Sequence, residues 1–100
     1  MEIEIFRQDN EVTACLKGRL DTPSSQEAAP QMASLEEYAA DAIVLDCTEL
    51  TYISSSGLRL FLTLRKAAAE KGGKVIVRNL SNEIRNVFMM TGFLNLFEIQ

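Results

Sequence analysis

Residues 42–77 read AIVLDCTELTYISSSGLRLFLTLRKAAAEKGGKVIV and predict a strand, a helix and a second strand in succession. Residues 42–45 form a short continuous apolar run, which is typical of a strand buried on both faces. The strongest helical pattern in the chain spans about residues 55–71, and Gly72-Gly73 ends it. Residues 75–77 are again continuously apolar. A helix between two buried strands predicts a right-handed parallel crossover.

The chain before this unit predicts an antiparallel hairpin, and the chain after it predicts one more helix and strand. Residues 2–19 contain two segments in which apolar and polar residues alternate, separated by turn-forming residues at 8–11. Ser81 is expected to cap a helix that ends near Gly92. A last strand is expected over about residues 94–99.

A further helix is expected directly after the hairpin, with two possible starts. Thr22 can cap the helix, and Pro23 then occupies a favourable first position. Ser24 and Glu27 offer a competing capping box, so the start remains open. Pro30 is expected to kink this helix or to delay its regular part, because proline removes a backbone donor.

With residues 46–53 assigned to a loop, the order of elements is β-β-α-β-α-β-α-β. This order predicts an α/β fold with a mixed sheet, an N-terminal antiparallel hairpin and α-helical crossovers. Residues 1–100 are expected to form a single domain, because a chain of 100 residues supports one hydrophobic core.

Composition excludes several classes of function. The chain is 47% hydrophobic and 24% charged, as in ordinary globular proteins. It contains no histidine, which excludes Ser–His and Cys–His nucleophiles, imidazole bases and histidine-ligated metals. A net charge of −4 with scattered basic residues argues against a nucleic-acid partner. No glycine-rich phosphate loop or metal-ligand pattern is present, so neither a cofactor nor a metal is expected.

Cys15 and Cys47 lie among apolar neighbours and are expected to be buried, reduced thiols, with a disulfide as the less favoured alternative. Residues 1–4 are acidic and lack the apolar run of a secretory leader. The longest apolar stretches are much shorter than the roughly 18 residues that a membrane span requires. We therefore expect a cytoplasmic protein without membrane contact.

The candidate site lies where two predicted strands end. Loops that follow the carboxyl ends of parallel strands lie along one edge of the sheet, where sites form. Leu20-Asp21-Thr22 follows the second predicted strand, and Ser54-Ser55-Ser56-Gly57 follows the third. The topology therefore predicts that Asp21 and the serine run are neighbours, although they lie far apart in the sequence.

The serine run has two interpretations. A serine hydroxyl can cap the helix that follows, which is worth about 1 kcal/mol, but a single serine is enough for that. A helix N-terminus also favours a phosphate on a neighbouring hydroxyl. Gly57 costs up to about 1 kcal/mol relative to alanine, which indicates a close approach to the backbone there. Capping and a modified or ligand-binding serine therefore both remain open.

Two pairs of apolar residues in the helices are also ambiguous. Leu58 and Leu62 lie off the main apolar stripe of their helix. They either cover a neighbouring element or form an exposed patch for a partner beside the serines. Met89-Met90 is expected to fill the core, with an adaptable contact surface as the alternative.

Residues 44–58, VLDCTELTYISSSGL, resemble the signature of the sulfate transporter and anti-sigma factor antagonist (STAS) domain. That signature runs from a buried strand ending in Asp, through a hydrophobic and an aromatic position, to Asp-Ser-Ser-Gly-Leu. Gly18-Arg19-Leu20-Asp21 resembles the family's second motif, Gly-x-Leu-Asp, and residues 88–93, FMMTGF, are similar to its third. The element order also agrees, so the resemblance covers essentially residues 1–100.

The resemblance implies an anti-sigma factor antagonist, as in the stand-alone bacterial members. Unphosphorylated, such a protein binds an anti-sigma factor that is a serine kinase, and so frees a sigma factor. The kinase phosphorylates the first serine after the motif Asp, the antagonist lets go, and a serine phosphatase restores it. By position that serine is Ser55, and the implied partner-binding residues are Asp21, Thr22, Ser54, Ser56, Gly57 and Leu58. Ser54 stands where the family usually has Asp, which leaves the modified hydroxyl open among the three serines.

Two other classes of function are alternatives to this one. A non-enzymatic module of a larger complex, either stressosome-like or a lipid-transport accessory, would use the same domain without control at Ser55. An enzyme or nucleotide binder is disfavoured, because histidine, a phosphate loop and a clustered carboxylate pair are all absent. A monomer is the expected oligomeric state.

Overall fold

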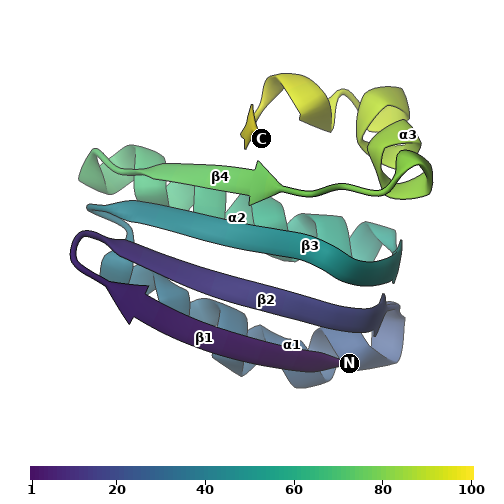
Figure 1. Ribbon diagram of the computed structural model, residues 1–100, viewed down its shortest axis with the longest axis horizontal. Helices are drawn as coiled ribbons and strands as arrows, with labels where there is room; N and C mark the ends of the chain where they lie inside the picture. The colour runs from purple at the N-terminus through teal and green to yellow at the C-terminus, as the bar shows by residue number, and fades with distance from the viewer.

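Five strands form one mixed sheet in the order β1-β2-β3-β4-β5 (Figure 1). This computed structural model describes residues 1–100. Only the β1–β2 pair is antiparallel, and every other neighbouring pair is parallel. The predicted α/β fold with an N-terminal hairpin is therefore confirmed. The strands are β1 (Glu2–Gln8), β2 (Glu11–Leu20), β3 (Ala42–Ile53), β4 (Lys74–Arg78) and β5 (Glu98–Ile99).

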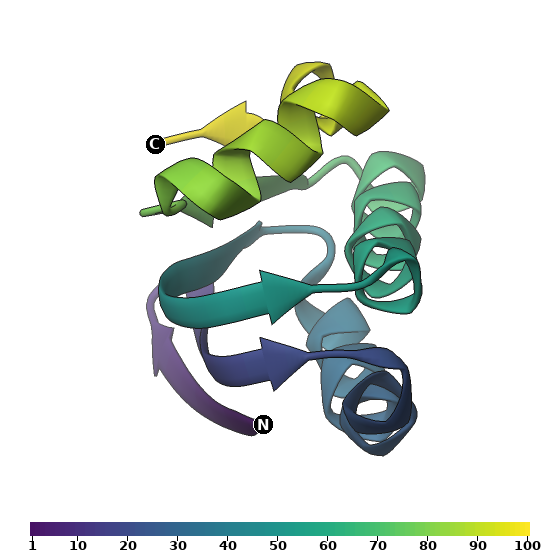
Figure 2. The same cartoon turned by 90° about the vertical axis from the view of Figure 1, so that its right-hand side faces the viewer.

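Two helices cover one face of the sheet, and a third lies at one end of it. Figure 2 shows α1 and α2 side by side on the same face, while α3 lies next to β4 and β5, far from α1. The helices are α1 (Thr22–Ser34), α2 (Ser55–Lys71) and α3 (Asn82–Thr91), and two 3-10 turns are η1 (Leu35–Tyr38) and η2 (Phe93–Asn95). The predicted bounds of α2 are confirmed, whereas the last strand is shorter than predicted because η2 occupies its first part.

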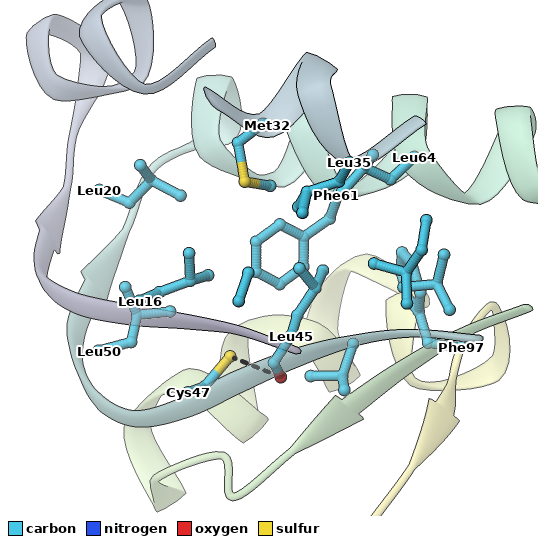
Figure 3. Close-up of a cluster of buried hydrophobic side chains, with 14 of the residues drawn as sticks. Leu16, Leu20, Met32, Leu35, Leu45, Cys47, Leu50, Phe61, Leu64 and Phe97 are labelled. Carbon is cyan, nitrogen blue, oxygen red and sulfur yellow. Dashed lines mark hydrogen bonds between the residues drawn. The ribbon is translucent and has the colours of Figure 1, made fainter. Parts of the chain in front are cut away.

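The core lies between the sheet and the two helices that cover it. In Figure 3 the ring of Phe61, on α2, points toward the sheet between side chains of β2 and β3. Phe61 also packs edge-on against Phe88 of α3, with ring centroids 5.9 Å apart. Phe97 lies 6.3 Å from the same ring, so one aromatic residue joins α2, α3 and the last segment of the chain. Burial of this cluster by the hydrophobic effect holds α2 in place on the sheet.

The prediction that residues 46–53 form a loop is wrong, because β3 continues to Ile53. The pairing of β2 with β3 shifts register twice, between Cys15 and Lys17 and again between Gly18 and Arg19. Each shift places one extra residue in β3, which moves the next inward side chain by one position. The buried residues of this part are therefore Cys47, Leu50 and Ile53, three apart rather than two.

The first helix begins at Thr22, within the predicted range, but both predicted caps are wrong, because Asp21 is the N-cap. The Asp21 carboxylate accepts from the Ser24 N–H at 3.0 Å, and the Ser24 hydroxyl accepts from the Asp21 N–H at 2.9 Å. This reciprocal capping box satisfies two backbone donors and uses neither Thr22 nor Glu27 as a partner. The helix then continues through Pro30 and tightens to a 3-10 turn only after Ser34.

The structure resolves the open assignments of apolar residues. Leu58 is buried, whereas Leu62 is 38% exposed, so only Leu58 covers a neighbouring element. Met89 and Met90 are 60% and 82% exposed, which makes the core-filling prediction wrong. Both cysteines are free thiols, with Cys47 buried as predicted and Cys15 only half-buried. No helix combines the length and the apolar composition needed to cross a membrane.

Candidate functional site

The carboxyl ends of β2 and β3 meet at one edge of the sheet and bring the two predicted segments together. The N–H and the hydroxyl of Ser54 both donate to the Leu20 carbonyl oxygen, at 2.9 and 3.0 Å. Leu20 is followed directly by Asp21, which caps α1, and Ser54 caps α2. The N-terminal ends of the two helices therefore lie next to each other, as the topology predicted.

Ser54 is the serine that caps the helix. Besides donating to Leu20, its hydroxyl accepts from the Gly57 N–H at 3.2 Å, and its backbone is extended. The hydroxyl thus has one donor and one acceptor partner inside the protein and is half-buried. Ser54 therefore does the capping that an Asp at the same position would do, and it also links the helix start to β2.

Ser55 and Ser56 differ from Ser54 in that neither hydroxyl has a hydrogen-bond partner within the chain. Ser55 is exposed and begins α2, while Ser56 is half-buried. The first N–H groups of a helix have no acceptor within it, and here only those of Gly57 and Leu58 find partners, both on Ser54. The helix start next to Ser55 therefore presents unpaired N–H groups and the positive end of the dipole.

Gly57 is required by close packing at the strand ends. An added Cβ would lie 2.9 Å from side-chain atoms of both Leu20 and Ile53, which are buried. The missing side chain lets the first turn of α2 rest directly on the ends of β2 and β3. This contact is the reason for a glycine at a helical position where it is intrinsically unfavourable.

Charged and aromatic groups surround the serines. The pKa of Asp21 is lowered, mainly because the Ser24 N–H and hydroxyl donate to its carboxylate. The guanidinium of Arg19 lies 4.3 Å from the centroid of the Tyr52 ring, and its Nε is 3.9 Å from the Asp21 carboxylate. Arg19 and Tyr52 were not predicted as site residues, because their pairing across β2 and β3 follows the second register shift.

A shallow groove of about 300 Å³ runs between the first turns of α1 and α2. Thr22 and Gln26 line it from α1, and Ser56 and Arg59 line it from α2. Arg59 is its one charged lining residue. Arg59 was not predicted as a site residue either, although the 3.6-residue helical period places it one turn after Ser55.

The partner-binding residues implied by the resemblance occupy two layers. Thr22 is exposed, and Asp21, Ser54 and Ser56 are half-buried at the edge of the sheet. Gly57 and Leu58 are buried behind them, so they support this surface rather than form it. No group of three or more His, Cys, Asp or Glu residues is placed to hold a metal ion.

Known proteins resemble this chain in both sequence and fold. The family model of the STAS domain matches residues 2–100. BtrV of Bordetella bronchiseptica, a candidate anti-sigma factor antagonist, is 29% identical over 99% of this chain and 85% of its own length. A solved candidate anti-sigma factor antagonist of Thermotoga maritima superposes with a TM-score of 0.88 and 16% identity, covering 97% of this chain and 84% of that one.

The antagonist SpoIIAA has been solved in two states, and both resemble this chain. The unphosphorylated form covers 99% of this chain with a TM-score of 0.75, 20% identity and 87% of its own length matched. The phosphorylated form, from Bacillus, covers 99% with a TM-score of 0.75, 21% identity and 91% of its own length. At these identities the solved structures establish the fold alone.

Proposed function

This chain belongs to the STAS domain family, and we propose that it acts as an anti-sigma factor antagonist controlled at Ser55. Unphosphorylated, it binds an anti-sigma factor that is a serine kinase and so frees a sigma factor. Phosphorylation at Ser55 releases it, and a serine phosphatase restores it. The names of full-length relatives as antagonists of anti-sigma-B and anti-sigma F factors support this role.

The observation that carries the proposal is the different state of the three serine hydroxyls. A kinase needs a hydroxyl that it can reach and deprotonate. Ser54 is tied to Leu20 and Gly57, and Ser56 is half-buried beside the groove, whereas Ser55 is exposed without a partner. Ser55 is therefore the best phosphate acceptor of the three serines. Ser54, which stands where the family usually has Asp, serves as the helix cap instead.

The chemical step leaves the fold in place. The Ser55 oxygen bonds to the γ-phosphorus of ATP, the bond from that phosphorus to the bridging oxygen breaks, ADP leaves, and the hydroxyl proton passes to the kinase or solvent. The new group adds about −1.5 to −2 charges at a helix end that favours an anion. Both the phosphorylated and the unphosphorylated form of SpoIIAA have the fold of this chain, so this fold is compatible with either state.

Release follows from the position of the phosphate in the interface. The proposed contact surface consists of Asp21, Thr22, Ser54 and Ser56 around Ser55, supported by Gly57 and Leu58. A phosphate in the middle of a surface built for a neutral hydroxyl must be desolvated against the partner. A penalty of about 4 kcal/mol weakens binding roughly a thousandfold. In this role the protein is a cytoplasmic, monomeric kinase substrate with no catalysis of its own.

The test compares partner capture by the wild type, Ser55→Ala, Ser55→Asp and Ser34→Asp. Ser34→Asp is the matched control, because Ser34 is an exposed serine at the opposite end of α1. We expect the wild type and Ser34→Asp to retain a serine kinase from source-cell lysate, and Ser55→Asp to lose it. Incubation of the captured kinase with ATP should place phosphate on Ser55, identified by peptide mass spectrometry, and Ser55→Ala should remain unmodified. Identical partners for all four proteins would instead favour the scaffold role.

A further inference from the structure

Arg59 lies one helical turn after Ser55 on the exposed side of α2. Both residues are exposed, and they are separated by four positions in the helix. Side chains at that spacing are neighbours, with Cβ atoms about 5–6 Å apart. The long arginine side chain therefore reaches any group attached to the Ser55 oxygen.

The guanidinium of Arg59 is uncommitted. It takes part in no ion pair and donates no hydrogen bond, and its neighbours one turn before and after on α2 are Ser55, Ser56, Leu62 and Thr63. Arg19, a cation at the same edge of the sheet, is engaged, since it lies over Tyr52 and near Asp21.

We propose that Arg59 is the internal counter-ion of a phosphate on Ser55, with its guanidinium donating to the phosphate oxygens. The inference rests on Ser55 being the modified residue and adds a positioning residue to that site. An acidic group four positions before a basic one is the favourable order in a helix. A guanidinium also binds phosphate oxygens in pairs, which makes these hydrogen bonds stronger than neutral ones.

The charges facing the phosphate support this assignment. On the β2 side, the Asp21 carboxylate repels an anion at Ser55, but it accepts from the Ser24 N–H and is held at the α1 cap. Arg19 is drawn toward Asp21 and the Tyr52 ring at the same edge. Arg59 is therefore the cation that is free to turn toward Ser55 without breaking a contact.

The consequence is a second change at the contact surface. Before phosphorylation Arg59 is a free cation on the wall of the groove between α1 and α2. After phosphorylation the Arg59 guanidinium is paired with the phosphate on Ser55 and is no longer available to a partner. The modification thus adds an anion to the surface and withdraws a cation from it.

The test uses protein in which phosphoserine is installed at position 55 during translation, so that no kinase is required. Four phosphoproteins are titrated by phosphorus NMR: the wild type, Arg59→Gln, Arg59→Lys and Arg85→Gln. Arg85 is an exposed arginine on a different helix, α3, and its replacement changes the net charge equally. We expect the phosphate of Arg59→Gln to titrate about half a pH unit higher than that of the wild type. Arg59→Lys should fall between them, and Arg85→Gln should match the wild type.

Two outcomes overturn the proposal. One is a phosphate titration in Arg59→Gln equal to that of the wild type, and the other is an equal displacement in Arg85→Gln. A second measurement compares Tm with and without phosphate, and the increase on phosphorylation should be smaller in Arg59→Gln than in the wild type. Because phosphoserine is installed without a kinase, the result is independent of whether a kinase uses Ser55 in the cell.

Discussion

The hydroxyl of Ser54 donates to the carbonyl oxygen of Leu20 across 3.0 Å, from the end of β3 to the end of β2. The N–H of Ser54 donates to the same oxygen at 2.9 Å. One carbonyl therefore fixes the end of β3 and the start of α2 against the residue before Asp21. This link sets the spacing between the two helix starts and with it the shape of the candidate contact surface.

Replacing Ser54 with alanine should destabilise the protein by about 1–2 kcal/mol, because the helix cap and the link to Leu20 are both lost. Ser56→Ala is the matched control, since its hydroxyl has no partner, and its effect should stay within about 0.5 kcal/mol. Urea unfolding followed by circular dichroism measures both. Equal stability of the two variants would show that the Ser54 contacts contribute nothing.

Gly57→Ala should also destabilise the protein, by about 1–3 kcal/mol, because the added methyl overpacks a close contact. Alanine is intrinsically better than glycine in a helix by roughly 1 kcal/mol, so propensity alone predicts a gain. The new Cβ would lie 2.9 Å from side-chain atoms of Leu20 and Ile53, however, and the packed ends of β2 and β3 must shift to receive it. The same unfolding experiment decides between the two effects, and a more stable variant would contradict the packing argument.

Asp21→Asn should make the protein less sensitive to acid. Hydrogen bonds from Ser24 lower the pKa of Asp21 below the ordinary value of 3.8, so the folded state favours the carboxylate. The associated stability is present above that value and is lost as the pH falls through the lower pKa of the folded state. Asparagine keeps a capping oxygen but does not titrate.

Unfolding at a series of pH values from about 5 to about 2 measures this effect. The free energy of unfolding should fall more steeply in the wild type than in Asp21→Asn. Some acid dependence should remain in the variant, because Asp46 also has a lowered pKa; burial raises it, but hydrogen bonds from Thr48 outweigh that effect. Parallel curves for the two proteins would exclude Asp21 as a source of acid sensitivity.

The two thiols should react with iodoacetamide at different rates. Burial raises the pKa of Cys47 to about 12 from 9.0, which leaves roughly a thousandfold less of the reactive thiolate. Burial and the nearby Asp46 carboxylate also raise the pKa of Cys15, but this residue is half-buried rather than buried. Peptide mass spectrometry of the native protein should find slow modification of Cys15 and none of Cys47. In denaturant both should react alike, and equal native rates would contradict the burial argument.

Much of the fold could be predicted from local patterns, but the path of β3 could not. Continuous apolar runs and glycine stops define residues 42–45 and α2 without reference to the rest of the chain. Residues 46–53 contain polar side chains, and their inward positions are three apart because of the two extra residues. The pairing of β3 with β2 causes that spacing, and the sequence of β3 alone does not show how the two strands pair.

The site was predictable to a similar extent. Sheet topology was enough to predict that Asp21 lies beside the serine run, because both follow carboxyl ends of strands. The division of roles among the serines was not, since it depends on which hydroxyl reaches the Leu20 carbonyl oxygen. The cap of α1 was missed for a related reason, because the Asp21–Ser24 pair competed with two other plausible capping sequences.

The separate states of Ser54 and Ser55 also bear on how this surface can change over evolutionary time. Ser54 bonds to the fold through two hydrogen bonds of its hydroxyl, whereas the Ser55 side chain has no structural partner. The fold therefore places no demand on the side chain at position 55, and only its role at the surface constrains that residue. Residue 54 is under the opposite constraint, since only side chains that cap the helix keep the surface in place. Folding therefore constrains residues 54 and 55 very differently, although they are adjacent in the chain.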